Sequence, residues 1–111
     1  MDPEDAKRVF YNDLPTKEAD HWASKLQHQS LGVYWSTATY AAWRYIPSTY
    51  VLCNDDQAFT KAVGEMFLQG AKQIEPTSFD IVERCDAGHF PFLSQVEWMV
   101  KVLRKAAGEK V

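Results

Sequence analysis

The sequence predicts an α/β fold in which a helical segment precedes a strand–helix–strand–helix unit. Residues 1–46 carry apolar side chains mainly at helical spacing. Residues 47–111 alternate between short runs of strand-forming residues and amphipathic runs. A strand–helix–strand unit of this length implies two parallel strands joined by a right-handed crossover. We therefore divide the chain into residues 1–46 and residues 47–111.

The first part is predicted to contain three helices. Asp2 and Pro3 suit the start of a helix that ends near residues 12–13. An amphipathic pattern predicts a second helix over residues 15–29. Residues 30–46 crowd aromatic side chains among small residues, which indicates a third short helix followed by an extended segment. These aromatic residues either line a hydrophobic substrate pocket or pack between the two parts of the chain.

The second part is predicted to contain strands over residues 50–53 and 79–85, with helices over residues 57–71 and 93–107. Ser94 and Glu97 have the spacing of a capping box, which would start the last helix. Both helices carry an apolar stripe that we expect to face the core. The stripes consist of Phe59, Ala62, Val63, Met66, Phe67 and Gly70, and of Leu93, Val96, Met99, Val100, Leu103 and Ala107.

Composition excludes several classes of function. The net charge is −3 and no basic run exceeds two residues, so we expect binding neither to nucleic acid nor to an anionic membrane. No apolar stretch approaches the length of a membrane span. The acidic N-terminal residues 1–5 lack the order of a signal peptide, which favours a cytoplasmic location.

The two cysteines have no metal-ligand spacing, and we expect neither a metal nor another cofactor. Cys53 and Cys85 each end a predicted strand. We expect two reduced, partly buried thiols; a disulfide would be within reach only if the two strands are neighbours. His21 and His28 are seven residues apart rather than four, so we expect both at the surface instead of on a metal.

The candidate catalytic residues are Asp56 and His89. Asp56 lies just past the first strand, and His89 lies just past the second on a turn hinged by Gly88. Because the carboxyl ends of parallel strands meet at one edge of a sheet, the two side chains are expected to touch despite their separation. A carboxylate beside a histidine forms two-thirds of a nucleophilic triad.

Each candidate has a plainer alternative. Asp56 is also placed to cap a helix that starts at Gln57, and it can do both. His89 is alternatively a solvated loop histidine. Asp55 is expected to face solvent. Ser94 is explained by the capping box.

Two segments resemble the C-terminal part of an α/β-hydrolase, namely residues 46–58 (IPSTYVLCNDDQA) and residues 87–94 (AGHFPFLS). The closest likeness is to the esterase branch that includes plant methylesterases, hydroxynitrile lyases and fungal homologues. The family's second acidic position after the penultimate strand falls on Asp56, and its Gly-His-x-Pro-x-Leu-Ser motif falls on residues 88–94. Residues 10–15 (FYNDLP) and the helix after them resemble the family's lid segment.

The resemblance implies a partial α/β-hydrolase fold, with residues 1–46 as a helical lid and residues 47–111 as the C-terminal part of the core. It also implies acyl-ester hydrolysis by a Ser-His-Asp triad, with His89 as general base and Asp56 as its orienting acid. The substrate would be a small-molecule ester or related acyl compound.

The chain also departs from the family pattern. No Gly-x-Ser-x-Gly motif is present, and no segment matches the family's oxyanion hole. Phe90 replaces a small residue, and Gln95-Val96 replaces a basic residue followed by proline. We therefore expect a fragment that is inactive alone: a truncated gene product, a misdivided gene model or one half of a split protein.

An unpaired edge is expected on the strand over residues 50–53, because two strands do not complete a covered sheet. This edge predicts self-association or binding of a homologue. The alternative function is therefore a non-catalytic binding or regulatory protein derived from the hydrolase fold.

Overall fold

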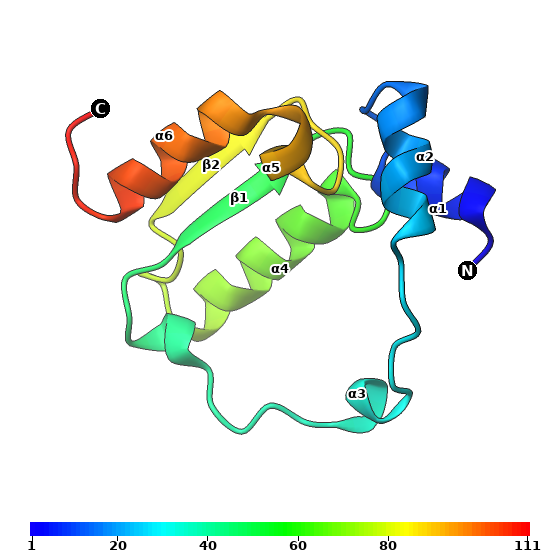
Figure 1. Cartoon of the computed structure of the whole chain (residues 1–111). Helices are drawn as coiled ribbons and strands as arrows, with labels where there is room; N and C mark the ends of the chain where they lie inside the picture. The colour runs from blue at the N-terminus through cyan, green and yellow to red at the C-terminus, as the bar shows by residue number, and fades with distance from the viewer.

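A computed structural model describes all 111 residues, and Figure 1 shows a small sheet with helices around it and a separate helical pair near the N-terminus. In chain order, the elements are α1 (Pro3–Phe10), α2 (Thr16–Ser24), α3 (Gly32–Trp35), the 3-10 helix η1 (Ala42–Arg44), β1 (Thr49–Cys53), α4 (Lys61–Ile74), β2 (Ile81–Cys85), α5 (Pro91–Ser94) and α6 (Val96–Ala106).

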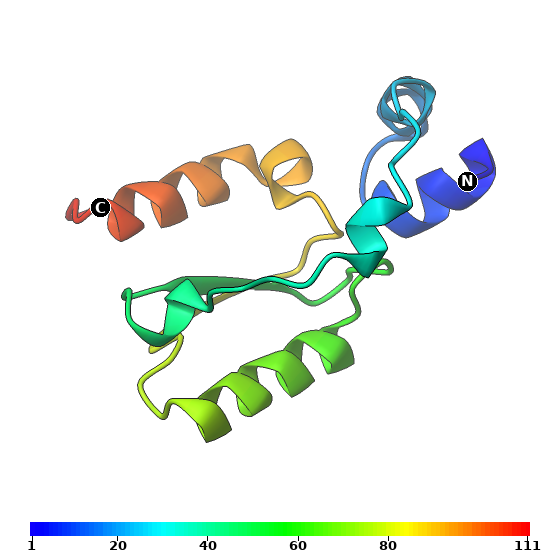
Figure 2. The same ribbon diagram turned by 90° about the horizontal axis from the view of Figure 1, so that it is seen from below.

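The sheet consists of β1 and β2, which pair in parallel. Thr49 lies opposite Ile81, and Cys53 lies opposite Cys85 at the other end of the ladder. Helix α4 crosses from the end of β1 to the start of β2 on one face of the sheet, and α6 lies on the opposite face (Figure 2). The predicted α/β fold class, with two parallel strands joined through a helix, is confirmed.

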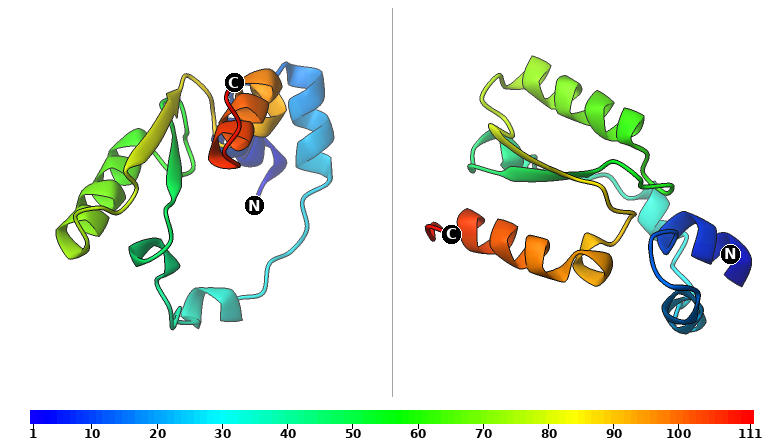
Figure 3. Two further views of the ribbon diagram at one scale, coloured as in Figure 1. Left: turned by 90° about the vertical axis from the view of Figure 1, so that its left-hand side faces the viewer. Right: turned by 90° about the horizontal axis from the view of Figure 1, so that it is seen from above.

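Helices α1 and α2 form a pair beside the carboxyl ends of the strands (Figure 3). The start of α1 is as predicted, since Asp2 Oδ1 accepts a hydrogen bond from the Glu4 amide at 2.8 Å and Pro3 occupies the first turn. Ala6 and Ala19 are buried. Lys7 Nζ joins the two helices by bonding Asp20 Oδ1 at 2.7 Å.

The prediction of a helix over residues 15–29 is wrong at its C-terminal end, because α2 stops at Ser24. Leu26, beyond that end, is 42% exposed and adds little buried apolar surface. Helices of this length depend on packing more than on propensity, so the pattern alone does not extend the helix. The predicted third short helix is present as α3, and η1 interrupts the extended segment that follows.

Helix α4 begins at Lys61 and not at Gln57, so the predicted span of residues 57–71 is displaced towards the C-terminus. Its N-cap is Thr60, whose Oγ1 accepts from the Val63 amide. The buried face consists of Gly64, Leu68 and Ala71.

The predicted core stripe of α4 is largely exposed. Met66 is 70% exposed and Phe67 is 58% exposed, and Phe59 before the helix is exposed as well. The expectation that this stripe faces the core is wrong for this chain. The physical reason is that the sheet has only two strands, so it covers only a narrow part of the helix surface. Gly64, Leu68 and Ala71 lie in this covered part.

The predicted last helix over residues 93–107 is divided into α5 and α6, with a break at Gln95. The capping-box prediction is wrong, because Gln95 is the N-cap of α6 and no side chain caps it. Ser94 instead donates its hydroxyl to Asp13 Oδ2. The predicted stripe is again mostly exposed, at Val96, Val100 and Leu103, whereas Val102 is the buried residue of α6.

The start of β2 also differs from prediction, because the strand begins at Ile81 instead of residue 79. Phe79 has a positive φ of 50°, which turns the chain before the strand. Its ring packs on Trp43, with 5.9 Å between ring centroids, and on Tyr50 at 5.6 Å. None of the helices is both long and apolar enough to cross a membrane.

Two glycines of α4 offer a matched test of how closely this helix approaches β1. A Cβ at Gly64 would lie 2.5 Å from Leu52 Cδ1, whereas a Cβ at Gly70 would meet nothing within 4 Å. In Gly64→Ala, overpacking against Leu52 should cost about 1–3 kcal/mol and should outweigh the gain in helix propensity, so the free energy of unfolding should fall. Gly70→Ala should raise it by roughly 0.5–1 kcal/mol through helix propensity. Urea denaturation followed by circular dichroism measures both, and equal effects of the two substitutions would contradict the packing described.

Candidate active site

The loops that follow β1 and β2 lie side by side at the carboxyl end of the two strands. The amide of Asn54 donates to the Cys85 carbonyl at 2.8 Å, and the amide of Asp55 donates to the Ala87 carbonyl at 3.0 Å. Asn54 Nδ2 also donates to Asp86 Oδ1 at 2.8 Å. These bonds extend the parallel pairing beyond the strands, so each loop leaves the sheet in a fixed position relative to the other.

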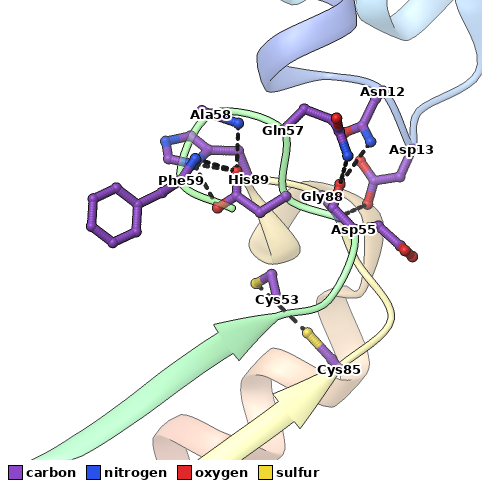
Figure 4. A network of polar contacts seen from close by, with 11 residues as sticks. Asn12, Asp13, Cys53, Asp55, Gln57, Ala58, Phe59, Cys85, Gly88 and His89 are labelled. Atoms are coloured by element: carbon purple, nitrogen blue, oxygen red, sulfur yellow. Dashed lines mark hydrogen bonds and ion pairs between the residues drawn. The ribbon is translucent and has the colours of Figure 1, made fainter. Parts of the chain in front are cut away.

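The structure brings together the two side chains singled out in the sequence. His89 Nδ1 lies 2.9 Å from Asp56 Oδ2 and 3.1 Å from Asp56 Oδ1. The Asp56 side chain is 9% exposed and the His89 side chain is 29% exposed. His89 lies over the loop that carries Ala58 and Phe59 (Figure 4). The carboxylate is thus held inside the fold while the imidazole reaches its surface.

Asp56 also stabilises its own loop. Its Oδ1 accepts hydrogen bonds from the amides of Ala58 at 2.8 Å and Phe59 at 2.9 Å. The predicted helix start at Gln57 is wrong, so these bonds close a turn and do not cap a helix. Two backbone donors fix the orientation of the carboxylate, and this fixed carboxylate faces the imidazole.

A carboxylate at Nδ1 determines which nitrogen of a neutral imidazole carries the proton. Asp56 accepts from Nδ1–H, and this leaves the lone pair on Nε2. The hydrogen bonds of His89 within the chain involve Nδ1 alone. Nε2 on a partly exposed ring is therefore placed to accept a proton from a group that approaches the surface.

Aromatic rings cover one side of this pair. The ring centroid of His89 lies 5.3 Å from that of Phe10 and 4.7 Å from that of Phe90. Phe10 and Phe90 stack on one another at 5.9 Å, and Tyr11 packs on Phe90 at 5.5 Å. Phe90 therefore bridges the histidine and helix α1.

Asn12 and Asp13, between α1 and α2, hold both loops in place. Asn12 Nδ2 donates to the Asp55 carbonyl at 2.8 Å. Asp13 Oδ2 accepts from the Gly88 amide at 2.7 Å and from the Ser94 hydroxyl. We call this pair the Asn12–Asp13 clamp, because Asn12 contacts the loop of the acid and Asp13 contacts the loop of the histidine (Figure 4).

The clamp was not predicted from the sequence, where these two residues were assigned to the end of a helix and to the segment that resembles the family's lid. The available signal was a polar pair enclosed by apolar residues in the segment FYNDLP. Gly88 completes the contact. A Cβ at this position would lie 2.4 Å from Asn12 Oδ1 and 2.8 Å from Asp13 Oδ1. Gly88 is thus required for close approach and not as a hinge, since Gly108 is the glycine with a positive φ.

The thiols of Cys53 and Cys85 lie next to each other below the two loops. Their Sγ atoms are 3.7 Å apart, and both cysteines are free. Burial raises the pKa of Cys53 to about 12, with a further contribution from Cys85. Burial also raises the pKa of Cys85. The prediction that both thiols are at least partly buried is confirmed, and the two strands are neighbours, which is the condition for a disulfide within reach.

The remaining residues considered in the sequence lie away from this edge. His21 and His28 are exposed as predicted, and so is Asp55. The chain contains no cluster of three or more His, Cys, Asp or Glu side chains that would hold a metal ion. Of the aromatic cluster, Tyr34, Trp35, Tyr40 and Tyr45 are exposed in this structure, so most of the cluster neither packs against the sheet nor surrounds His89.

An apolar cavity of about 450 Å³ lies along α4, and neither Asp56 nor His89 lines it. Its lining residues are Trp43, Tyr50, Phe59, Met66, Phe67, Gly70, Ala71, Ile74 and Phe79. The cavity therefore belongs to the exposed apolar face of α4 and not to the histidine–acid pair.

Comparison with known proteins identifies the family. A family model described as the alpha/beta hydrolase family matches residues 1–102. The chain belongs to this family. Over all 111 residues it is 41% identical to alpha/beta hydrolase nvfD of Aspergillus novofumigatus, and it spans 42% of that protein. Over 97 residues, which are 87% of the chain, it is 30% identical to probable hydrolase R7 of a Phoma species and spans 39% of it.

The two-stranded sheet is therefore a partial α/β-hydrolase fold, as the resemblance of residues 46–58 and 87–94 implied. The chain spans about two-fifths of the length of these α/β-hydrolases. The matched segment includes α1 and α2 as well as the strands, so the Asn12–Asp13 clamp lies within the region that matches the family.

Removing the acceptor of the clamp should weaken the fold. In Asp13→Ala, the Gly88 amide and the Ser94 hydroxyl lose a charged acceptor in a partly buried position. The free energy of unfolding should fall by about 2 kcal/mol. The matched control is Asp5→Ala, which removes a carboxylate paired with Arg8 at the exposed surface and should change stability little. Urea denaturation measures both, and an Asp13→Ala effect no larger than the control would contradict the clamp.

Alkylation of Cys53 should follow its raised pKa. Only the thiolate reacts, so labelling by iodoacetamide should increase about tenfold per pH unit and should not level off below the pKa of about 12. The control is a short peptide with an unburied cysteine, whose rate should level off above pH ~9. Mass spectrometry of the Cys53 peptide measures the rate. A plateau at the same pH as in the control would show that the thiol is not buried as described.

Proposed function

We propose that this chain supplies the histidine and the acid of a serine hydrolase that cleaves acyl esters. His89 is the general base, and Asp56 is the carboxylate that orients it. The observation that carries the proposal is the contact of 2.9 Å between His89 Nδ1 and Asp56 Oδ2, at the carboxyl edge of two parallel strands. It leaves Nε2 without a hydrogen bond inside the chain, and a nucleophilic triad requires this nitrogen to accept the proton of the nucleophile.

In the proposed reaction, His89 Nε2 removes the proton from a serine hydroxyl while the serine oxygen attacks the ester carbonyl. Asp56 stabilises the imidazolium that results. The imidazolium then gives its proton to the leaving alcohol, and the acyl group stays on the serine. His89 next removes a proton from water, the water oxygen attacks the acyl group, and the serine leaves with the proton from the imidazolium. The 111 residues contain no Gly-x-Ser-x-Gly motif, so the serine and the oxyanion donors are proposed to come from sequence outside them.

The two parts of the chain have different roles in the proposed hydrolase. Residues 1–46 act as a lid segment and residues 47–111 as the C-terminal part of the hydrolase core. Support for the lid comes from Phe10, whose ring lies 5.3 Å from that of His89. The aromatic rings of Phe10 and Phe90 beside the base favour an ester with an apolar group on that side.

The Asn12–Asp13 clamp is proposed to position the pair. Asn12 bonds the residue before Asp56, and Asp13 bonds the residue before His89. A displacement of either loop would lengthen the contact between the carboxylate and the imidazole, and catalysis is sensitive to shifts of about 1 Å.

The decisive experiment is a chimaera in which this chain replaces the matching segment of nvfD. If the proposal is correct, a fluorophosphonate probe labels the chimaera, and His89→Ala reduces labelling and p-nitrophenyl ester hydrolysis by at least about a thousandfold. Asp56→Asn should have a loss of similar order. His21→Ala is the control, because His21 is an exposed histidine of α2 and its removal should leave activity unchanged.

The isolated 111-residue chain should neither react with the probe nor hydrolyse the ester, since a histidine–acid pair without a nucleophile has little hydrolytic activity. Hydrolysis by the isolated chain that His89→Ala abolishes would contradict this part of the proposal. A chimaera that folds and is labelled, but whose labelling is independent of His89, would overturn the role of the histidine.

A second candidate function, a non-catalytic binding or regulatory protein, is favoured by the amount of exposed apolar surface. Only 14 of the 111 residues are buried, Met66 and Phe67 of α4 are exposed, and β1 has one unpaired edge. Such an edge favours self-association or pairing with a homologue. An inactive chimaera, together with a stable complex between the isolated chain and nvfD on a sizing column, would support this second function.

A further inference from the structure

Cys53 and Cys85 are the last ladder partners of the two parallel strands. Neighbouring strands lie roughly 4.8 Å apart, and a disulfide joins Cα atoms separated by about 4.4–6.8 Å. The two Sγ atoms are already 3.7 Å apart, so both side chains project to the same face. A disulfide of about 2 Å requires each thiol to rotate slightly and does not require the strands to move.

We propose that Cys53 and Cys85 are a modification site, a dithiol that a low-molecular-weight disulfide such as oxidised glutathione converts into an intrachain disulfide. The inference does not depend on the proposed hydrolase reaction. It rests on the register of the strands, the distance between the thiols and the difference in their burial.

The exchange proceeds in two balanced steps. Cys85, the more exposed of the two, loses its proton and attacks one sulfur of oxidised glutathione; the glutathione disulfide breaks and one reduced glutathione leaves. Cys53 then loses its proton and attacks Cys85 Sγ, which displaces the second reduced glutathione. Two protein thiols and one glutathione disulfide thus become one protein disulfide and two glutathione thiols.

The burial of the thiols determines how this site behaves. The pKa values of both thiols are raised, so thiolate is scarce at neutral pH and the first attack is slow. Once Cys85 carries glutathione, Cys53 is held next to it and competes well with a thiol from solution. The pair is therefore a slow site that closes within one chain, and not a rapidly reacting thiol of the kind found in redox enzymes.

The disulfide would lie directly below the candidate active site. Asp56 follows Cys53 by three residues and His89 follows Cys85 by four. In the reduced chain, the two strand ends are held together by hydrogen bonds, including Asn54 to Cys85 and Asp55 to Ala87. The disulfide adds a covalent link at the same place, so the two loops can no longer separate by opening of the strand ends.

The test is incubation of the 111-residue chain with oxidised glutathione at pH ~9, where thiolate is more abundant. We expect a product about 2 Da lighter than the reduced chain, in which peptide mapping finds Cys53 joined to Cys85 and which dithiothreitol reverses. Hydrogen exchange at the amides of Asn54 and Asp55 should slow severalfold in this product. These measurements on the unsubstituted chain need no variant to fold.

Two variants separate the roles of the thiols. Cys53→Ser should stop at a glutathione adduct on Cys85, and Cys85→Ser should react severalfold more slowly because the remaining thiol is the more buried one. The inference is overturned if the unsubstituted chain accumulates the Cys85 adduct without closing, forms disulfide-linked dimers, or forms the Cys53–Cys85 disulfide only in urea.

Discussion

The parallel pairing of β1 with β2 is the constraint on which the other features depend. Because both strands run in the same direction, the residues that follow them leave the sheet at the same edge. Asp56 contacts His89 at this end of the sheet, and Cys53 lies beside Cys85 at the last position of the strands. The Asn12–Asp13 clamp forms hydrogen bonds with both loops. In an antiparallel pair the two loops would lie at opposite ends of the sheet, and none of these contacts would form.

The same pairing explains why so much apolar surface is exposed. A parallel sheet is normally covered by helices on both faces, and α4 and α6 do lie on opposite faces (Figure 2). However, two strands are narrower than the apolar faces of these helices. The helix residues that lie directly over the two strands are buried, such as Gly64 and Val102. Met66, Phe67 and Leu103 lie beyond the width of the sheet and are exposed. The chain spans about two-fifths of its α/β-hydrolase relatives, which accords with a sheet of this width.

Features that depend on local signals could be predicted from the sequence. Short runs of strand-forming residues identified both strands, and their order identified the parallel pairing and the contact between Asp56 and His89. The sequence was insufficient where a side chain forms other hydrogen bonds than its local pattern suggests. Ser94 has the spacing of a capping box, but its hydroxyl bonds Asp13, 81 residues away, and α6 therefore starts without a side-chain cap. Asp56 binds two amides of its own turn, so α4 starts later than its pattern suggested.

The Asn12–Asp13 clamp also bears on the order in which the chain folds. Its bonds to Gly88 and Ser94 join residues 75 and 81 positions apart, whereas the residues of β1 and β2 that face each other are 32 positions apart. Bringing together residues so distant in the chain costs more conformational entropy, and these contacts stabilise the chain only after the sheet exists. We therefore expect the clamp to form after the sheet during folding.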